Sequence, residues 1–252
     1  MITTLTPIRI TDDKQFETFQ RCFLTYHAQL KDLYVSYNIC DDSNEEYHSK
    51  VDNFLAGLNI TPTYIQNSGT NFYDVISSLI SSVCTKYFLF IIDDVEIAPT
   101  KIIKSAFYAM EEVPELVQVK LGHGTILQHP NQIIINSDDA SYCDIVFEPL
   151  KIDDDIIWIT DISRELPSSE QYLFGCWNAL MRAEFFKPYN EKISQMKDQT
   201  SETFHDYAHN ASFFIPDYVF DGGYKAGWIN FKCYLYAWWR QGETPEEHFN
   251  QS

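Results

Sequence analysis

Two pairs of adjacent aspartates are the residues in this sequence best suited to chemistry. Asp41-Asp42 follows a strand-like run at 33–39, and Asp93-Asp94 follows six apolar residues at 87–92, with Glu96 completing an acid-x-acid spacing. Carboxylates held against an apolar core are costly unless they are paired or bound to a cation. Hard divalent cations prefer carboxylate oxygens and leave coordination positions open for phosphate oxygens. The pattern predicts a Mn²⁺ or Mg²⁺ site at Asp93 and Asp94.

Other interpretations of the acidic residues remain open. Asp93 and Asp94 could instead cap the helix that begins near Pro99, or lie in a plain loop. The run 153–155 precedes a strand-like segment at 156–160, which places it at the opposite end of its element and favours a solvated turn. The pair at 138–139 lies between two strand-like runs and has the composition of a loop.

The elements that must position these acids alternate regularly in the first hundred residues. Apolar residues recur at helical spacing over 13–30, 44–58 and 70–83, and β-rich runs lie at 3–10, 33–39 and 60–66. Thr11-Asp12-Asp13 predicts the start of the first helix, and Ser43-x-x-Glu46 has the pattern of a capping box for the second. The unalternating run 87–92 is typical of a strand buried on both faces of a parallel sheet. The order predicts a mostly parallel α/β sheet with right-handed crossovers.

The second half of the chain is less regular. It predicts a helix at 99–113, strands at 116–121, 131–136, 144–149 and 156–160, a strand at 172–180 that leads into a helix near 182–186, and helices around 202–213 and 230–240. No repeat or low-complexity linker separates the halves. We therefore expect a single domain over 1–252, with a ligand-binding half at 1–98 and a second half at 99–252.

Composition limits the classes of partner. Eighteen Lys+Arg against 36 Asp+Glu give a net charge of −18 over 252 residues, which argues against nucleic-acid binding because phosphate contacts need a positive patch. The six cysteines form no C-x-x-C pair, which fits reduced thiols and a cytoplasmic protein. We expect neither a secretion signal nor a transmembrane segment, because the N-terminus lacks a basic flank and no uncharged run reaches about 18 residues.

The order of these elements and acids resembles family 2 glycosyltransferases of the A-type fold. The resemblance covers about the first 110 residues and continues weakly to about 240. It rests on Asp41-Asp42-Ser43 after the second strand, a Gly-containing loop at 67–70, and the segment 91–99 that ends in Pro99. The sequence departs from the family where Thr6-Pro7-Ile8-Arg9 replaces a Pro-Thr-Tyr-Asn-like segment, and where no glycine follows Asp42.

The resemblance implies a three-layer α/β/α fold of the nucleotide-diphospho-sugar transferase kind and a set of roles. Pro7 and Arg9 would line the nucleotide pocket, and Asp41 or Asp42 would contact the base or ribose. The loop residues Asn67 and Gly69 would lie beside the nucleotide-diphosphate sugar. Asp94, with Asp93 and Glu96, would hold Mn²⁺ or Mg²⁺ against the diphosphate, and His205 is a further metal candidate.

A glycosyl transfer also needs a general base to activate the acceptor hydroxyl, a contribution of about 10²–10⁴ in rate. In inverting members of the family this is an acid at the start of a helix in the second half, for which Asp206 is preferred and Glu202 is next. Helix capping is an equal alternative for either residue. Trp177 could stack on a sugar and Asn178 could bond a hydroxyl, although Trp177 fits an ordinary core position equally well.

The sequence therefore favours a metal-assisted, inverting glycosyltransferase. This enzyme would move a sugar from a nucleotide-diphosphate sugar to a hydroxyl of a glycan, lipid-linked or polysaccharide acceptor. One alternative is a sugar-nucleotide pyrophosphorylase, against which the absence of glycine from residues 6–14 counts. Another is a catalytically silent relative that binds a carbohydrate or a protein partner.

Overall fold

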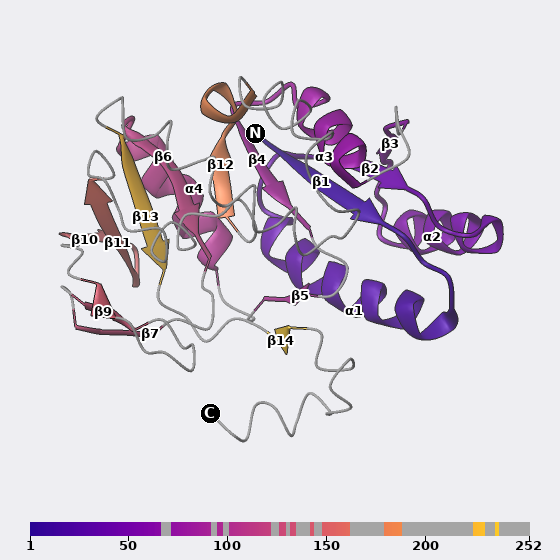
Figure 1. Ribbon diagram of the computed structural model, residues 1–252, viewed down its shortest axis with the longest axis horizontal. Helices are drawn as coiled ribbons and strands as arrows, with labels where there is room; N and C mark the ends of the chain where they lie inside the picture. Colours follow the sequence, from indigo (N-terminus) through magenta and orange to yellow (C-terminus); the bar gives the residue numbers. More distant parts are fainter. Residues whose placement is uncertain are drawn as a thin grey trace.

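The computed structural model describes residues 1–66, 72–91, 95–97, 101–121, 126–129, 132–134, 142–143, 148–161, 179–187, 224–229 and 235–236. A continuous sheet of nine strands runs through both halves of the described chain, in the order β10-β11-β13-β6-β12-β4-β1-β2-β3 (Figure 1). Over the same residues, no helix combines the length and apolar character needed to cross a membrane.

The first half confirms the alternation predicted from the sequence. Its elements are β1 (Ile2–Ile8), α1 (Asp13–Leu30), β2 (Val35–Asp41), α2 (Glu45–Gly57), β3 (Thr63–Tyr64), α3 (Phe72–Ser81) and β4 (Tyr87–Phe90). The strands β4, β1, β2 and β3 lie side by side and are all parallel. Asp12 caps α1 as predicted, because its side chain accepts a hydrogen bond from the N–H of Gln15 at 2.8 Å.

The second half adds one helix and many short strands. Its elements are β5 (Val95–Glu96), α4 (Ile102–Glu112), β6 (Leu116–Lys120), β7 (Ile126–His129), β8 (Gln132–Ile134), β9 (Tyr142–Cys143), β10 (Glu148–Ile152), β11 (Asp155–Asp161), β12 (Ala179–Arg182), β13 (Lys225–Ile229) and β14 (Leu235–Tyr236). Residues 183–187 continue β12 as a helical turn. The helix predicted over 230–240 is wrong at Leu235–Tyr236, which pair with β5 as an antiparallel strand.

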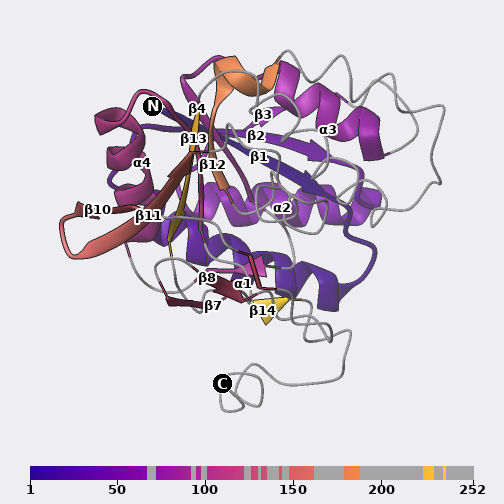
Figure 2. The ribbon, with the colours of Figure 1, turned by 60° about the vertical axis from the view of Figure 1, so that its left-hand side comes forward.

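The sheet is covered on both faces, which confirms the three-layer α/β/α arrangement. Figure 2 shows α1 on one side of β1 and β2 and α3 on the other. One core joins apolar residues of α1, α2 and α4 to β1 and β4, including Phe23, Val51 and Ala106. On the opposite face Asn38 of β2 bonds Ser82 after α3 at 2.7 Å, and Phe88 of β4 packs edge-on against Phe186.

Parallel pairing dominates only in the first half of the sheet. Antiparallel pairs join β4 to β12, β12 to β6, β13 to β11 and β11 to β10. The antiparallel pairs at the centre of the sheet arise because β12, from a distant part of the sequence, lies between β4 and β6 and is antiparallel to both. The fold class is therefore as predicted, whereas the sheet itself is mixed.

Arg182 at the end of β12 ties α4 to the centre of the sheet. Its side chain is buried and donates to the carbonyls of Met110 at 2.6 Å and Leu116 at 3.2 Å. Its guanidinium also lies over the ring of Tyr87, 5.2 Å from the centroid. A buried charge is tolerated here because carbonyls at and just beyond the C-terminus of α4 accept its hydrogens.

Candidate functional site at the carboxyl edge of the sheet

The strands β4, β1 and β2 end at one edge of the sheet, which we call the carboxyl edge. The register places Ile8 of β1 beside Asp41 of β2, and Leu5 of β1 beside Phe90 of β4. Ile91 extends the pairing, because its N–H donates to the carbonyl of Leu5 at 2.9 Å. The segments that follow these three strands therefore emerge next to one another, at the edge where open α/β sheets bind ligands.

The loops after β1 and β2 are bonded directly to each other. The N–H of Asp42 donates to the carbonyl of Ile8, and the N–H of Asn44 to that of Ile10, each at 3.0 Å. The N–H of Ile10 in turn donates to the hydroxyl of Ser43 at 2.8 Å. These bonds make the two loops one unit.

Ser43 consequently has a different role from the predicted one. The N-cap of α2 is Asn44, whose side chain makes no capping hydrogen bond. The capping-box prediction for Ser43 and Glu46 is wrong, because the hydroxyl of Ser43 serves the loop after β1 instead of the first turn of α2. The side chain of Ser43 bonds the loop after β1, although the local sequence pattern predicts that it caps the helix.

The two adjacent aspartates after β2 are separated by the alternation of the strand. The side chain of Asp41 is 3% exposed, and its Oδ1 accepts the N–H of Ser43 at 2.9 Å. Its Oδ2 lies 3.2 Å from Nδ1 of His48, in an ion-pair contact without hydrogen-bond geometry. Asp42 is exposed. Of the pair predicted to contact a nucleotide, Asp41 shapes the turn and Asp42 is the residue accessible to a ligand.

The loop after β1 contributes the other described candidates. Pro7 is buried in β1 opposite Cys40, and Arg9 is exposed just beyond the end of the strand. Burial, with the carboxylates of Asp42 and Asp41 as smaller causes, raises the pKa of the Cys40 thiol to about 11, so this thiol stays protonated. Among the described residues, the exposed surface of this edge thus includes the carboxylate of Asp42 and the guanidinium of Arg9.

Most of the remaining predicted site residues are not among the described residues, and one is described in its backbone alone. Those outside them are Asn67, Gly69, Asp93, Asp94, Trp177, Asn178, Glu202, His205 and Asp206. Glu96 is described in its backbone only, where β5 pairs with β14. Within the described part of the chain, no group of three or more His, Cys, Asp or Glu side chains is arranged to hold a metal.

The structure describes the residues on either side of the Asp93-Asp94 segment. Residue 91 is hydrogen-bonded at the carboxyl edge, and β5 resumes at Val95, with the N–H of Ile97 donating to the hydroxyl of Thr25 on α1 at 3.1 Å. Ile91, the last described residue before this segment, lies at the same edge as Asp42. The acids 93, 94 and 96 supply hard oxygen donors, which suit Mg²⁺ or Mn²⁺.

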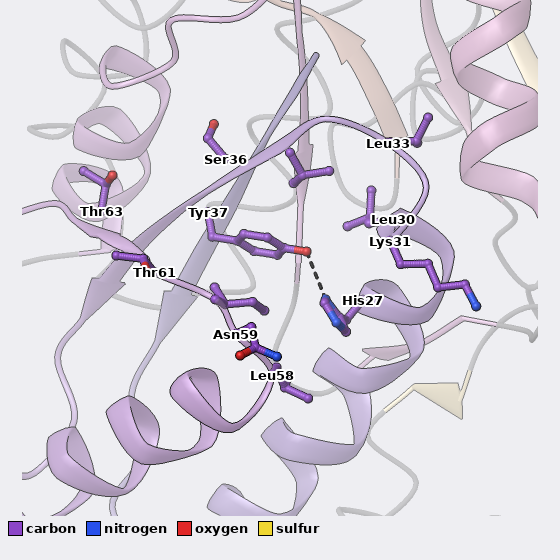
Figure 3. Close-up of a pocket in the computed structure, with 12 residues that line it drawn as sticks. His27, Leu30, Lys31, Leu33, Ser36, Tyr37, Leu58, Asn59, Thr61 and Thr63 are labelled. Atoms are coloured by element: carbon purple, nitrogen blue, oxygen red, sulfur yellow. Dashed lines mark hydrogen bonds between the residues drawn. The ribbon is translucent and has the colours of Figure 1, made fainter.

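A cavity of about 410 Å³ lies elsewhere, between the start of β2 and the C-terminal ends of α1 and α2 (Figure 3). Nδ1 of His27 and the hydroxyl of Tyr37 lie 3.1 Å apart on its wall, and Lys31 and Asn59 also line it. Burial lowers the pKa of His27 and raises that of Tyr37 to about 12. No predicted site residue lines this cavity, and it belongs to the end of β2 opposite Asp41.

Sequence reasoning missed two polar residues, one in contact with Asp41 and one buried at the end of another strand. His48 was not singled out, although it lies seven residues after Asp41 and one turn into α2. Lys120 was also missed, and it is a buried lysine at the carboxyl end of β6. A lysine that ends the otherwise apolar or neutral run Leu116–Lys120 is a signal that the sequence did contain.

Comparison with known proteins supports the fold at low sequence identity. No protein-family model matches the sequence, and no curated protein matches it. A structure of S. aureus TarS 1–349 in complex with UDP has a TM-score of 0.56 and 10% identity, over 94% of this chain and 60% of that one. TarS 1–349 without a named ligand has a TM-score of 0.56 and 13% identity, over 99% of this chain and 62% of that one.

A third solved structure belongs to another class of enzyme. The 4-diphosphocytidyl-2C-methyl-D-erythritol synthase of Anaerococcus prevotii has a TM-score of 0.50 and 10% identity, over 100% of this chain and 98% of that one. The chain spans about three fifths of the length of the TarS structures that it matches. The fold is that of A-type nucleotide-diphospho-sugar transferases, which confirms the predicted resemblance at the level of the fold.

Proposed function

We propose that this chain is a glycosyltransferase that uses a nucleotide-diphosphate sugar as its donor. The observation that carries the proposal is the carboxyl edge, where Asp42 and Arg9 follow neighbouring strand ends and Ile91 is the last described residue before the acidic segment at 93–96. The same fold in TarS has been solved with UDP and, in a further structure with a TM-score of 0.52, with UDP-GlcNAc. The first half of the chain, 1–98, would bind the donor.

Different residues would contact different parts of the nucleotide. Asp42 would accept a hydrogen bond from the base or ribose, and Arg9 would lie over the nucleotide with Pro7 shaping the wall beneath it. Asp41 would hold the turn instead of contacting the ligand. Asn67 and Gly69 would complete the pocket from the loop before α3.

Asp93 and Asp94, with Glu96 and His205 as further ligands, would hold Mn²⁺ or Mg²⁺ in an acid-x-acid arrangement of the DXD type. The fit rests on the chemistry of three carboxylates within four residues of the sequence. When bound, the ion stabilises the negative charge of the departing diphosphate. A chain with a net charge of −18 needs such an ion more than a basic protein does.

The second half, 99–252, would bind the acceptor. Asp206, or else Glu202, would take the proton from the acceptor hydroxyl as the transfer proceeds with inversion. Trp177 and Asn178 would border the sugar. The acceptor would be a glycan, a lipid-linked saccharide or a growing polysaccharide, as in polysaccharide biosynthesis.

Calorimetry with a panel of nucleoside diphosphates, in the presence and absence of Mn²⁺, tests the proposal. We expect one nucleotide to bind in a Mn²⁺-dependent manner and Asp94→Asn to abolish that dependence. Asp153→Asn is the matched control, because Asp153 lies in the β10–β11 turn with a φ of 49° that asparagine tolerates. Absence of binding for every nucleotide would refute the proposal.

A nucleotidyltransferase is the second candidate, and it is favoured by the likeness to the synthase from A. prevotii over nearly the full length of both chains. It differs in the bond that is broken, because it releases pyrophosphate from a nucleoside triphosphate. Residues 6–14 contain no glycine, which counts against a Gly-rich phosphate loop. Pyrophosphate release from a nucleoside triphosphate, with no binding of diphosphates, would favour this candidate.

A further inference from the structure

The cavity of about 410 Å³ at the start of β2 is large enough for a small molecule, since binding sites for such ligands usually enclose about 300–1,000 Å³. It lies at the opposite end of β2 from the carboxyl edge, because its wall includes Val35, the first residue of β2, and Asp41 is the last. Tyr37 on the wall and Asp41 are four residues apart on this strand, a separation of about 13 Å along extended backbone. A ligand in this cavity would therefore occupy a site of its own.

His27 and Tyr37 form a hydrogen-bonding pair on the wall of the cavity that the core holds in place. Nδ1 of His27 lies 3.1 Å from the hydroxyl of Tyr37, and Figure 3 shows Tyr37 reaching from β2 toward His27 on α1. The buried ring of Phe23 packs against both, with centroids 6.5 Å from His27 and 5.8 Å from Tyr37. Burial lowers the pKa of His27 and raises that of Tyr37 to about 12, so both side chains are uncharged at pH 7. In either tautomer of His27, the pair retains one donor and at least one acceptor beyond its own bond.

The rest of the wall is polar and carries little charge. Hydroxyl and amide side chains line it at Ser36, Asn59, Thr61 and Thr63. Apolar side chains that are only half-buried line it at Leu33, Val35 and Leu58. Among the described residues that line the cavity, Lys31 supplies the one permanent charge and none is a carboxylate. Such a wall matches a ligand that has hydroxyl groups at its edges and apolar C–H faces.

The two helix ends beside the cavity disfavour an anionic ligand. Both α1 and α2 end at it, and the C-terminal end of a helix carries a partial negative charge. Asn59, with a φ of 58°, closes the end of α2 in a Schellman turn, in which its own N–H and that of Ile60 donate to the carbonyls of Ala56 and Leu55 at 3.0 Å each. The ammonium of Lys31 opposes two such ends, and the described wall offers no carboxylate for a cation. The ligand that fits is therefore neutral.

We propose that this cavity binds a saccharide, at a site separate from that of the nucleotide. Hydroxyl groups of the sugar would bond the pair His27 and Tyr37 and the amide of Asn59, and its C–H face would lie against the apolar part of the wall. The inference goes beyond the proposed function and does not rest on it, because the residues of the cavity have no part in nucleotide binding. In a glycosyltransferase, the site would hold a part of the acceptor glycan that is distant from the reacting hydroxyl.

Two substitutions remove contacts to the ligand at little cost to the fold. Tyr37→Phe keeps the ring against Phe23 and deletes the hydroxyl, and Asn59→Gly deletes the amide at a position whose positive φ suits glycine. Loss of one neutral hydrogen bond should weaken saccharide binding about 2- to 10-fold in each variant. Tyr34→Phe is the matched control and should leave the affinity unchanged, because Tyr34 is 86% exposed and does not line the cavity.

The experiment titrates the wild type and each variant with glucose, galactose, mannose, N-acetylglucosamine and maltotriose, and follows the amide ¹H–¹⁵N shifts. Urea unfolding of each variant verifies its fold, and inorganic phosphate is titrated in parallel as the anionic probe. We expect at least one saccharide to shift the amides of Tyr37, Asn59 and Thr61 and to leave those of the carboxyl edge unchanged. Its affinity should fall in Tyr37→Phe and Asn59→Gly and stay the same in Tyr34→Phe.

Three results would overturn the inference: no saccharide shifts the amides of the cavity, phosphate alone shifts them, or the affinity for the saccharide is equal in the wild type and all variants. Saccharide-induced shifts confined to the carboxyl edge would also overturn it. Calorimetry with nucleoside diphosphates tests the proposed function separately, so that either conclusion can fail without the other.

Discussion

The adjacent residues Asp41 and Asp42 should respond in opposite ways to the same substitution. Asp41→Ala removes a buried carboxylate that accepts the N–H of Ser43 at 2.9 Å and contacts His48 at 3.2 Å. A hydrogen bond to a charged group contributes about 1.5–3 kcal/mol, and an ion pair with a half-exposed partner contributes up to about 1 kcal/mol. Because the substitution also ends the desolvation of the carboxylate, we expect a net loss of about 2 kcal/mol in the free energy of unfolding.

Asp42→Ala should leave the fold intact and weaken the site. Substitutions at exposed positions usually change the free energy of unfolding by less than about 0.5 kcal/mol. If Asp42 accepts a hydrogen bond from the nucleotide, its removal should cost about 1.5–3 kcal/mol of binding, which is about 10- to 150-fold in affinity.

Urea unfolding followed by circular dichroism, and calorimetry with the nucleoside diphosphate that binds the wild type, measure the two effects separately. Asp32→Ala is the matched control, because Asp32 is exposed just before the opposite end of β2. Unchanged stability in Asp41→Ala would show that the turn is built differently. Full affinity in Asp42→Ala would show that the exposed carboxylate does not contact the nucleotide.

Three further predictions concern the described structure. Arg182→Met should lower the free energy of unfolding, measured in urea, by about 3–5 kcal/mol, because two buried carbonyls lose a charged donor. Lys86→Met, which removes an exposed ion pair, should lower it by less than about 1 kcal/mol. Equal effects of the two substitutions would contradict the buried role of Arg182. Iodoacetamide at pH 8 should alkylate the exposed Cys84 and spare Cys40, whose thiol pKa is raised to about 11. Mass spectrometry of the native and the urea-unfolded protein measures which of the two thiols is alkylated in each state. Burial lowers the pKa of His27 below its ordinary 6.5, so the folded state favours the neutral ring. The contribution of His27 to the free energy of unfolding is therefore present above pH 6.5 and is lost as the pH falls below it. If His27→Gln left the pH dependence of the free energy of unfolding unchanged, this account would be contradicted.

The sequence by itself determined the first half of the fold. Helical spacing of apolar residues, the cap at Asp12 and the unalternating run at 87–92 are local patterns, and the elements α1 and β4 appear where those patterns occur. The pair Asp41-Asp42 was also placed correctly at the end of a strand, because strand length and the first polar residue can be read from a single segment.

Only the tertiary structure decided how the adjacent acids differ. Asp41 and Asp42 are equivalent in sequence, and the pairing of β2 with β1 turns one toward α2 and leaves the other exposed. Ser43 fits the pattern of a capping box, but its hydroxyl accepts the N–H of Ile10, which lies 33 residues away in sequence. The antiparallel entry of β12 between β4 and β6 likewise depends on partners about 90 and 60 residues distant. Such pairings are set by which surfaces meet when the chain is folded, and that information is absent from any local window of the sequence.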